Sequence, residues 1–68
     1  MQDEVIIWVI LESNRIRIGT SIASVAPIPF GADIITRVTK EDANITKAEV
    51  KRYAKKGFSI EKIKEMYD

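Results

Sequence analysis

The chain opens on an unbroken apolar run, Val5-Ile6-Ile7-Trp8-Val9-Ile10-Leu11. Seven consecutive apolar residues leave a strand no face that prefers water, so this segment is expected to be covered on both sides. After the polar pair Ser13-Asn14, the segment Arg15-Ile16-Arg17-Ile18 alternates polar and apolar positions, as a half-buried strand does. The two segments together predict an antiparallel hairpin.

The length of the loop around Ser13-Asn14 decides the register of this hairpin. A loop of two or four residues would place Leu11 opposite Ile16, on a face that is nearly all apolar. On the other face it would place Trp8 over Gly19, with arginine side chains nearby. A three-residue loop would instead reverse the facing of the second strand.

A third strand is predicted after an apolar loop. The segment Ser24-Val25-Ala26-Pro27-Ile28-Pro29-Phe30-Gly31 contains two prolines, which lack the N–H that a central strand needs. The following segment, Asp33-Ile34-Ile35-Thr36-Arg37-Val38-Thr39, is rich in β-branched residues and ends at a polar boundary. The simplest assembly is a three-stranded antiparallel sheet.

Two helices are predicted from capping signals at the C-terminal end. Thr46-Lys47-Ala48-Glu49 has the pattern of a capping box, in which the threonine hydroxyl and the glutamate carboxylate each bind a free backbone amide. The helix is expected to end near Lys56, with Gly57 in the left-handed conformation. Ser59 is then positioned to cap a second helix.

These elements predict one small α+β domain over residues 1–68. The order is β-β-β-α-α, with a β-rich half over residues 1–39 and a helix hairpin over residues 45–68. Both helices carry one apolar face. We therefore expect the helix hairpin to pack on one face of the three-stranded antiparallel sheet.

The second face of the sheet is the candidate partner-binding surface. Two short helices are expected to cover only one face, which leaves the other for a partner. The residues predicted to bind the partner are Ile6, Trp8, Ile10, Arg15 and Arg17, together with Ile28 and Phe30 of the apolar loop. The alternatives are that Trp8 belongs to the core and that the loop caps the protein's own core.

Composition excludes several kinds of chemistry. The chain has no cysteine and no histidine, which excludes thiolate metal sites, zinc fingers and histidine-dependent catalysis. Its three glycines stand alone, so no phosphate-binding loop is predicted. We expect no enzyme activity, no cofactor and no small-molecule substrate.

The start of the chain, Met1-Gln2-Asp3-Glu4, is acidic where a secretory signal is basic. The apolar run that follows is too short to span a membrane. Polar residues and prolines interrupt the next uncharged stretch, residues 18–32. These features predict a cytoplasmic protein without a membrane segment.

Basic side chains concentrate in the predicted helices. Residues 46–68 carry seven basic and four acidic side chains, a net charge of +3, whereas residues 1–45 carry four basic and six acidic ones, a net charge of −2. The candidates for contacts with phosphates are Lys47, Lys51, Arg52, Lys55 and Lys56. Their spacing is also that of an ordinary solvated helix, and both interpretations stay open.

The stretch from Thr46 to Asp68, with Gly57-Phe58-Ser59 at its corner, resembles the first two helices of a helix-turn-helix domain. That family reads bases with a further, recognition helix in the major groove. The 68 residues contain no candidate for this helix. Without this helix we expect no base-specific readout by this mode. Similar capped helix hairpins also occur in short assembly domains.

The favoured hypothesis is a non-enzymatic interaction module that homodimerises through the second sheet face or docks it on a larger protein. Its size is that of small phage or mobile-element proteins that modify a host machine. The alternative is a small nucleic-acid-binding regulator that presents its basic helices to phosphates. Replacing Trp8 by alanine should abolish binding under the first hypothesis. Reversing the charges of Lys51 and Lys55 should abolish binding under the second.

Overall fold

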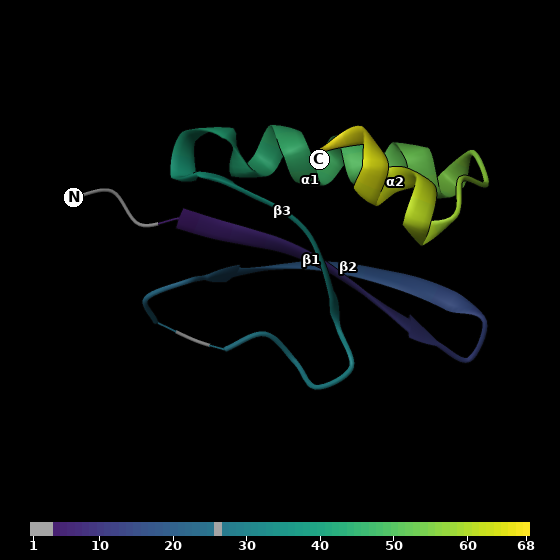
Figure 1. Cartoon of the computed structure of the whole chain (residues 1–68), viewed down its shortest axis with the longest axis horizontal. Helices are drawn as coiled ribbons and strands as arrows, with labels where there is room; N and C mark the ends of the chain where they lie inside the picture. Colours follow the sequence, from purple (N-terminus) through teal and green to yellow (C-terminus); the bar gives the residue numbers. More distant parts are fainter. Residues whose placement is uncertain (1–3, 26) are drawn as a thin grey trace.

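A computed structural model describes residues 4–25 and 27–68 of the chain. The acidic start over residues 1–3 and position 26 of the predicted apolar loop lie outside the described residues. The elements are β1 (Glu4–Glu12), β2 (Arg15–Ile22), β3 (Asp33–Thr39), α1 (Lys40–Lys55) and α2 (Ile60–Met66). Both helices lie on one face of an open antiparallel sheet with the strand order β2-β1-β3 (Figure 1). The predicted α+β architecture is confirmed.

The predicted register of the first hairpin is also confirmed. Leu11 lies opposite Ile16 and Trp8 lies opposite Gly19. Ser13 and Asn14 have φ angles of 47° and 68°. Positive φ at both positions is the mark of the type I′ two-residue turn, whose twist matches that of the strands, and serine and asparagine adopt it here. The chain therefore adopts the two-residue loop, Ser13-Asn14, and not a four-residue one.

The third strand pairs with β1, which makes the most apolar segment of the chain the central strand. Ile7 pairs with Thr36 and Trp8 with Ile34, so Ile35 is an extra residue in β3. This β-bulge changes the local direction of the strand. Ile35 thereby joins the buried cluster beneath the helices.

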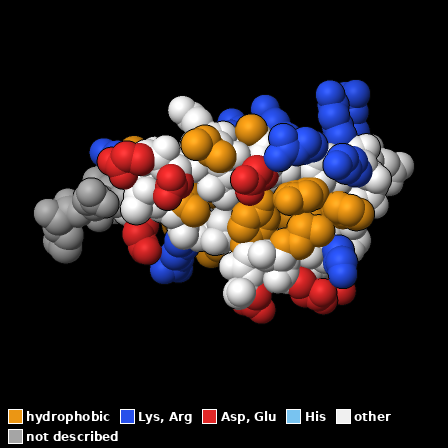
Figure 2. All heavy atoms as spheres, turned by 90° about the horizontal axis from the view of Figure 1, so that it is seen from above, with side chains coloured by type: hydrophobic (Ala, Val, Ile, Leu, Met, Phe, Trp, Pro, Cys, Tyr) orange, Lys and Arg blue, Asp and Glu red, His pale blue; other side chains and the backbone are white. Residues whose placement is uncertain are grey.

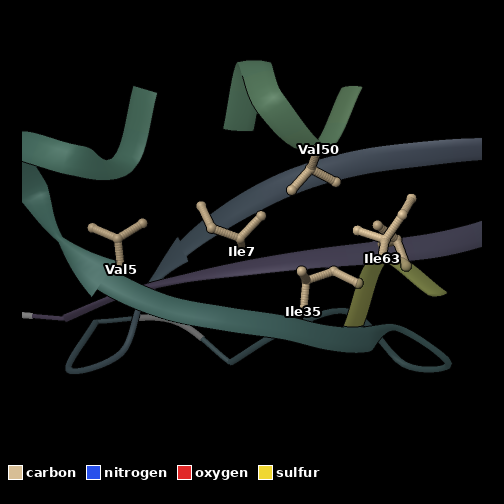
Figure 3. Close-up of a cluster of buried hydrophobic side chains, with 6 residues drawn as sticks. Val5, Ile7, Ile35, Val50 and Ile63 are labelled. Atoms are coloured by element: carbon tan, nitrogen blue, oxygen red, sulfur yellow. The ribbon is translucent and has the colours of Figure 1, made fainter. Parts of the chain in front are cut away.

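The core lies between the sheet and the helices. Figure 2 views the molecule from the helix side, which covers this core. Figure 3 shows its side chains converging from the sheet below and the helices above. The buried cluster consists of Val5, Ile7, Val9, Ile35, Val50 and Ile63. Among these, Ile7, Val50 and Ile63 have no exposed surface, so each helix contributes one fully buried anchor.

The predicted start of the first helix is wrong. The helix begins at Lys40, directly after β3, and Thr46 is buried inside it. The capping box at Thr46 and the helix-hairpin boundary at residue 45 therefore do not hold. Ile45, the residue before Thr46, is 63% exposed on the surface of the helix.

The helix can start early because its first turn suits the helix dipole. Glu41 and Asp42 lie there, near the positive end of the dipole. The cap residue is Thr39, whose hydroxyl donates to the Asp42 carboxylate at 3.3 Å. The segment after β3 that looked like a polar boundary is therefore the start of α1.

The corner between the helices has the predicted form. Gly57 has a φ of 93°, a left-handed conformation that glycine adopts without strain. The amide of Phe58 donates to the Tyr53 carbonyl at 3.2 Å and that of Gly57 to the Ala54 carbonyl at 3.1 Å, which together form a Schellman motif. The hydroxyl of Ser59 accepts from the Lys62 amide at 3.1 Å, so Ser59 caps α2 as predicted.

A side-chain hydrogen bond ties the end of α2 to the middle of α1. The Tyr67 hydroxyl donates to Glu49 Oε1 at 2.8 Å. Burial raises the pKa of Tyr67, and the hydrogen bond to Glu49 raises it further. The phenol therefore stays protonated at neutral pH and keeps its role as donor.

Candidate interaction surface

The second face of the sheet is largely covered by the chain itself. The described residues of the segment between β2 and β3 pass on the side of the sheet opposite to the helices (Figure 1). Ile6 is only 9% exposed and Trp8 only 7% exposed, whereas Ile10 is half-buried. A Cβ atom built on Gly31 would lie 3.9 Å from Ile10 Cδ1, which places this loop against the sheet. The expectation of an uncovered face is therefore wrong at Ile6 and Trp8.

The polar atom of Trp8 is satisfied within the chain. Its Nε1–H donates to Ser21 Oγ at 3.0 Å. Its ring lies so close to Gly19 that an added Cβ would overlap it. On the same face, Arg17 Cζ is 5.7 Å from the Trp8 ring centroid, and Arg17 Nη2 is 3.2 Å from Glu12 Oε2. Trp8 thus has the surroundings of a core residue.

Because of this burial, we expect the fluorescence of Trp8 to be blue-shifted and protected from acrylamide. The protection should be present at protein concentrations where the mass from light scattering is that of a monomer. A red-shifted, freely quenched emission from the monomer would show that the β2–β3 loop does not cover this face.

The remaining residues of the predicted partner surface lie in two places. Ile28 is half-buried and Phe30 is fully exposed on the β2–β3 loop. Arg17 is engaged with Glu12 beside Trp8. Arg15 instead lines a groove between β2 and α1. The structure therefore does not gather the predicted partner residues into one open patch.

The groove between β2 and α1, called the β2–α1 groove below, has a volume of about 430 Å³. It is lined by Asn14, Arg15, Ile16, Ile18, Lys51, Ala54 and Lys55. Its apolar lining comes from the side of β2 that faces the helices and from Ala54. Basic residues line the groove as well. In Figure 2, which views the helix side of the molecule, Lys and Arg side chains lie beside hydrophobic ones toward one end.

The charge of the β2–α1 groove is of one sign. Three basic residues, Arg15, Lys51 and Lys55, line it, and no acidic residue does. Within residues 4–25 and 27–68, none of these three forms an ion pair. The groove therefore presents unpaired positive charge beside apolar surface, a combination suited to an acidic ligand with apolar side chains.

The groove brings together residues from both sequence-based predictions. Arg15 comes from the partner set, and Lys51 and Lys55 come from the set predicted to contact phosphates. The other three cations of that set, Lys47, Arg52 and Lys56, do not line the groove. Sequence reasoning did not identify Ile16, Ile18 and Ala54 as parts of a site. It assigned them to the apolar faces of a strand and a helix that pack in the protein core.

A second hollow, of about 370 Å³, lies between β3 and α2. It is lined by Ile34, Ile35, Glu61, Lys64, Glu65 and Asp68. Its charges are mixed, and Lys64 Nζ is 3.9 Å from Asp33 Oδ1 at its edge. This hollow has no charge preference comparable to that of the β2–α1 groove.

Ser59 and Lys62 have the Ser-x-x-Lys spacing of some serine nucleophiles, which sequence reasoning overlooked. In the structure both are exposed, and the Ser59 hydroxyl accepts from the Lys62 backbone as a helix cap. Among the residues described, no group of three or more acidic side chains is arranged to hold a metal ion.

No helix within the described part of the chain is long and apolar enough to cross a membrane. Of the two hollows, the β2–α1 groove is the candidate site with the more definite chemistry, because its charged residues are all basic. Comparisons with known proteins found no family model, no curated protein and no solved structure that matches the chain.

Proposed function

We propose that the protein is a small non-enzymatic interaction module that docks on a larger protein by taking an acidic segment of that protein into the β2–α1 groove. The observation that supports this proposal is that three basic residues without an ion pair among the described residues, Arg15, Lys51 and Lys55, line one groove together with Ile16 and Ile18. Apolar contacts would supply affinity, and the cations would select the charge of the partner.

A second copy of the chain is a poor occupant of this groove. Two grooves that face each other would bring the cations of Lys51 and Lys55 close to those of the other copy. Like charges across an interface oppose association. The proposal therefore assigns the groove to a partner of opposite charge rather than to self-association.

A nucleic acid is also a weaker candidate than an acidic protein segment. Phosphates would use the cations and leave the apolar lining without a function. Proteins that bind single strands usually add an aromatic stacking platform, but Trp8 is buried on the other side of the sheet. Binding of an oligonucleotide is nevertheless a defined outcome of the test.

The test uses a labelled, end-capped peptide, Glu-Thr-Val-Thr-Val-Thr-Glu, and fluorescence anisotropy at about 50 mM salt, where charge interactions are little screened. We expect the Lys51→Glu, Lys55→Glu double variant to weaken binding by about 2 kcal/mol, or roughly 30-fold, because two attractions become repulsions. The matched control is Arg52→Glu with Lys56→Glu, which changes the charge of the same helix outside the groove and should bind nearly as the parent does.

Three outcomes would contradict the proposal. The first is the failure of the peptide to bind at about 1 mM, the limit of weak recognition. The second is an equal loss in the groove variant and in the control, which would indicate unspecific attraction. The third is a single-stranded oligonucleotide that binds more tightly than the peptide and loses affinity in both variants, which would favour nucleic-acid binding.

A further inference from the structure

We infer that the acidic segment binds as an extended strand that pairs antiparallel with the free edge of β2. The inference rests on the proposed function of the β2–α1 groove and adds the mode of binding. It depends on which backbone groups of β2 point away from β1.

The two-residue turn determines the direction of those groups. In such a hairpin the residues on either side of the turn, here Glu12 and Arg15, form a hydrogen-bonded pair. From Arg15 onward, every second residue of β2 directs its N–H and C=O groups to β1. The residues between them direct theirs outward, and these are Ile16, Ile18 and Thr20.

Hydrogen bonds at the far end of the hairpin follow the same alternation. The amide of Ala23 donates to the Glu4 carbonyl at 2.9 Å, towards β1. The carbonyl of Ile22 instead accepts from the Val25 amide at 3.0 Å, away from β1. Since β1 is the only strand beside β2 in the described sheet, the outward groups of Ile16, Ile18 and Thr20 have no strand partner.

The edge of β2 is better suited to strand addition than the edge of β3. β2 pairs with β1 along its eight residues without a shift of register. β3 carries a bulge, and α2 packs beside it with Lys64 close to Asp33. Bulges and covered edges are features that oppose edge-to-edge pairing.

The same two residues of β2, Ile16 and Ile18, form part of both the free edge and the groove. Ile16 and Ile18 direct their backbone groups outward and also line the groove with their side chains. Residues of an added strand that lie opposite them would place side chains on the same face. Apolar residues at those two positions would pack on the isoleucines. An acidic residue two positions beyond the one opposite Ile16 would lie by Asn14, which lines the groove together with its basic residues. Strand addition of this kind combines backbone affinity with side-chain selection.

The probe peptide has this pattern, with two valines between two glutamates on one face and three threonines on the other. In antiparallel pairing, the valines opposite Ile16 and Ile18 direct their N–H groups to β2, and the threonines direct theirs away. N-methylation of both valines should therefore raise the dissociation constant tenfold or more. Each methyl group removes about one hydrogen bond to β2 and adds a steric clash. N-methylation of the three threonines is the matched control and should leave affinity within about twofold.

Amide hydrogen exchange gives a second readout on the protein. At a peptide concentration ten times the dissociation constant, the amides of Ile16 and Ile18 should exchange about tenfold more slowly. The amides of Arg17 and Gly19 already bond to β1 and serve as the internal reference.

The outcomes separate this inference from the proposal on which it rests. If the unmodified peptide binds with groove-dependent affinity but the valine-methylated peptide binds equally well, strand addition is overturned and docking in the groove stands. The same holds if only the threonine-methylated peptide loses affinity. If the unmodified peptide does not bind at about 1 mM, the proposed function itself fails.

Discussion

Replacing Ile7 by alanine should lower the free energy of unfolding by about 2–5 kcal/mol, the range for deletion of a fully buried large side chain. Ile7 has no exposed surface and lies on the central strand beneath both helices (Figure 3). A chain of this length is expected to have a total stability of only about 3–10 kcal/mol. The substitution should thus remove a large share of it, measured by urea unfolding followed by circular dichroism.

Ile45→Ala is the matched control for this substitution. It removes the same atoms from the same residue type, but Ile45 is 63% exposed on α1. We expect a change below about 0.5 kcal/mol, since surface substitutions are usually that mild. A cost for Ile7→Ala no larger than that for Ile45→Ala would mean that the core is not centred on β1.

Replacing Gly19 by alanine should cost about 3 kcal/mol, at the upper end of what overpacking usually costs. The added methyl group would overlap the indole ring of Trp8. The ring cannot move freely, because its Nε1–H is bonded to Ser21 and its face is covered. Urea unfolding of the variant, followed by circular dichroism, measures the loss.

A double-mutant cycle tests the cause of that loss. In a Trp8→Leu background the smaller side chain leaves room for the methyl group, so Gly19→Ala should then cost less than about 1 kcal/mol. Sulfate added equally to all four proteins keeps the weaker variants folded for measurement. An equal cost in both backgrounds would place the effect in the backbone of β2 rather than in the contact with Trp8.

The first hairpin was predictable because its information is local. Ser13 and Asn14 both accept positive φ, and this turn sets every cross-strand pair that follows. The α1–α2 corner was predictable for a similar reason. Gly57 and Ser59 act on backbone groups a few residues away, independently of the rest of the fold.

The start of α1 was predicted wrongly because a local cap signal competed with packing against the sheet. Thr46 and Glu49 have the spacing of a capping box, but a helix that starts at Lys40 can bury Thr46 and anchor Val50 in the core. Packing against the sheet outweighs a cap, which contributes only about 1 kcal/mol. The sequence pattern alone does not contain this comparison.

The candidate site was predicted only in fragments. Arg15 and the pair Lys51 and Lys55 belonged to different hypotheses, because they are far apart in the chain and in elements of different type. They line one groove because α1 packs beside β2, the edge strand. The sequence left open whether Trp8 belongs to the core and whether the loop after β2 caps that core. The burial of Ile6 and Trp8 decides this and moves the candidate surface away from the second sheet face.

By itself the sequence determined the elements of this protein, the register of its hairpin and the caps at its helix corner, since these depend on interactions between near neighbours in the chain. Tertiary structure alone decided that β1 is central, that α1 begins directly after β3, and that Arg15 meets Lys51 and Lys55. The physical reason is that the free energy gained by burying apolar surface does not depend on how far apart the buried residues lie in the sequence. Burial selects the arrangement that covers Ile7 and its neighbours best, and the charges of the groove meet as a consequence.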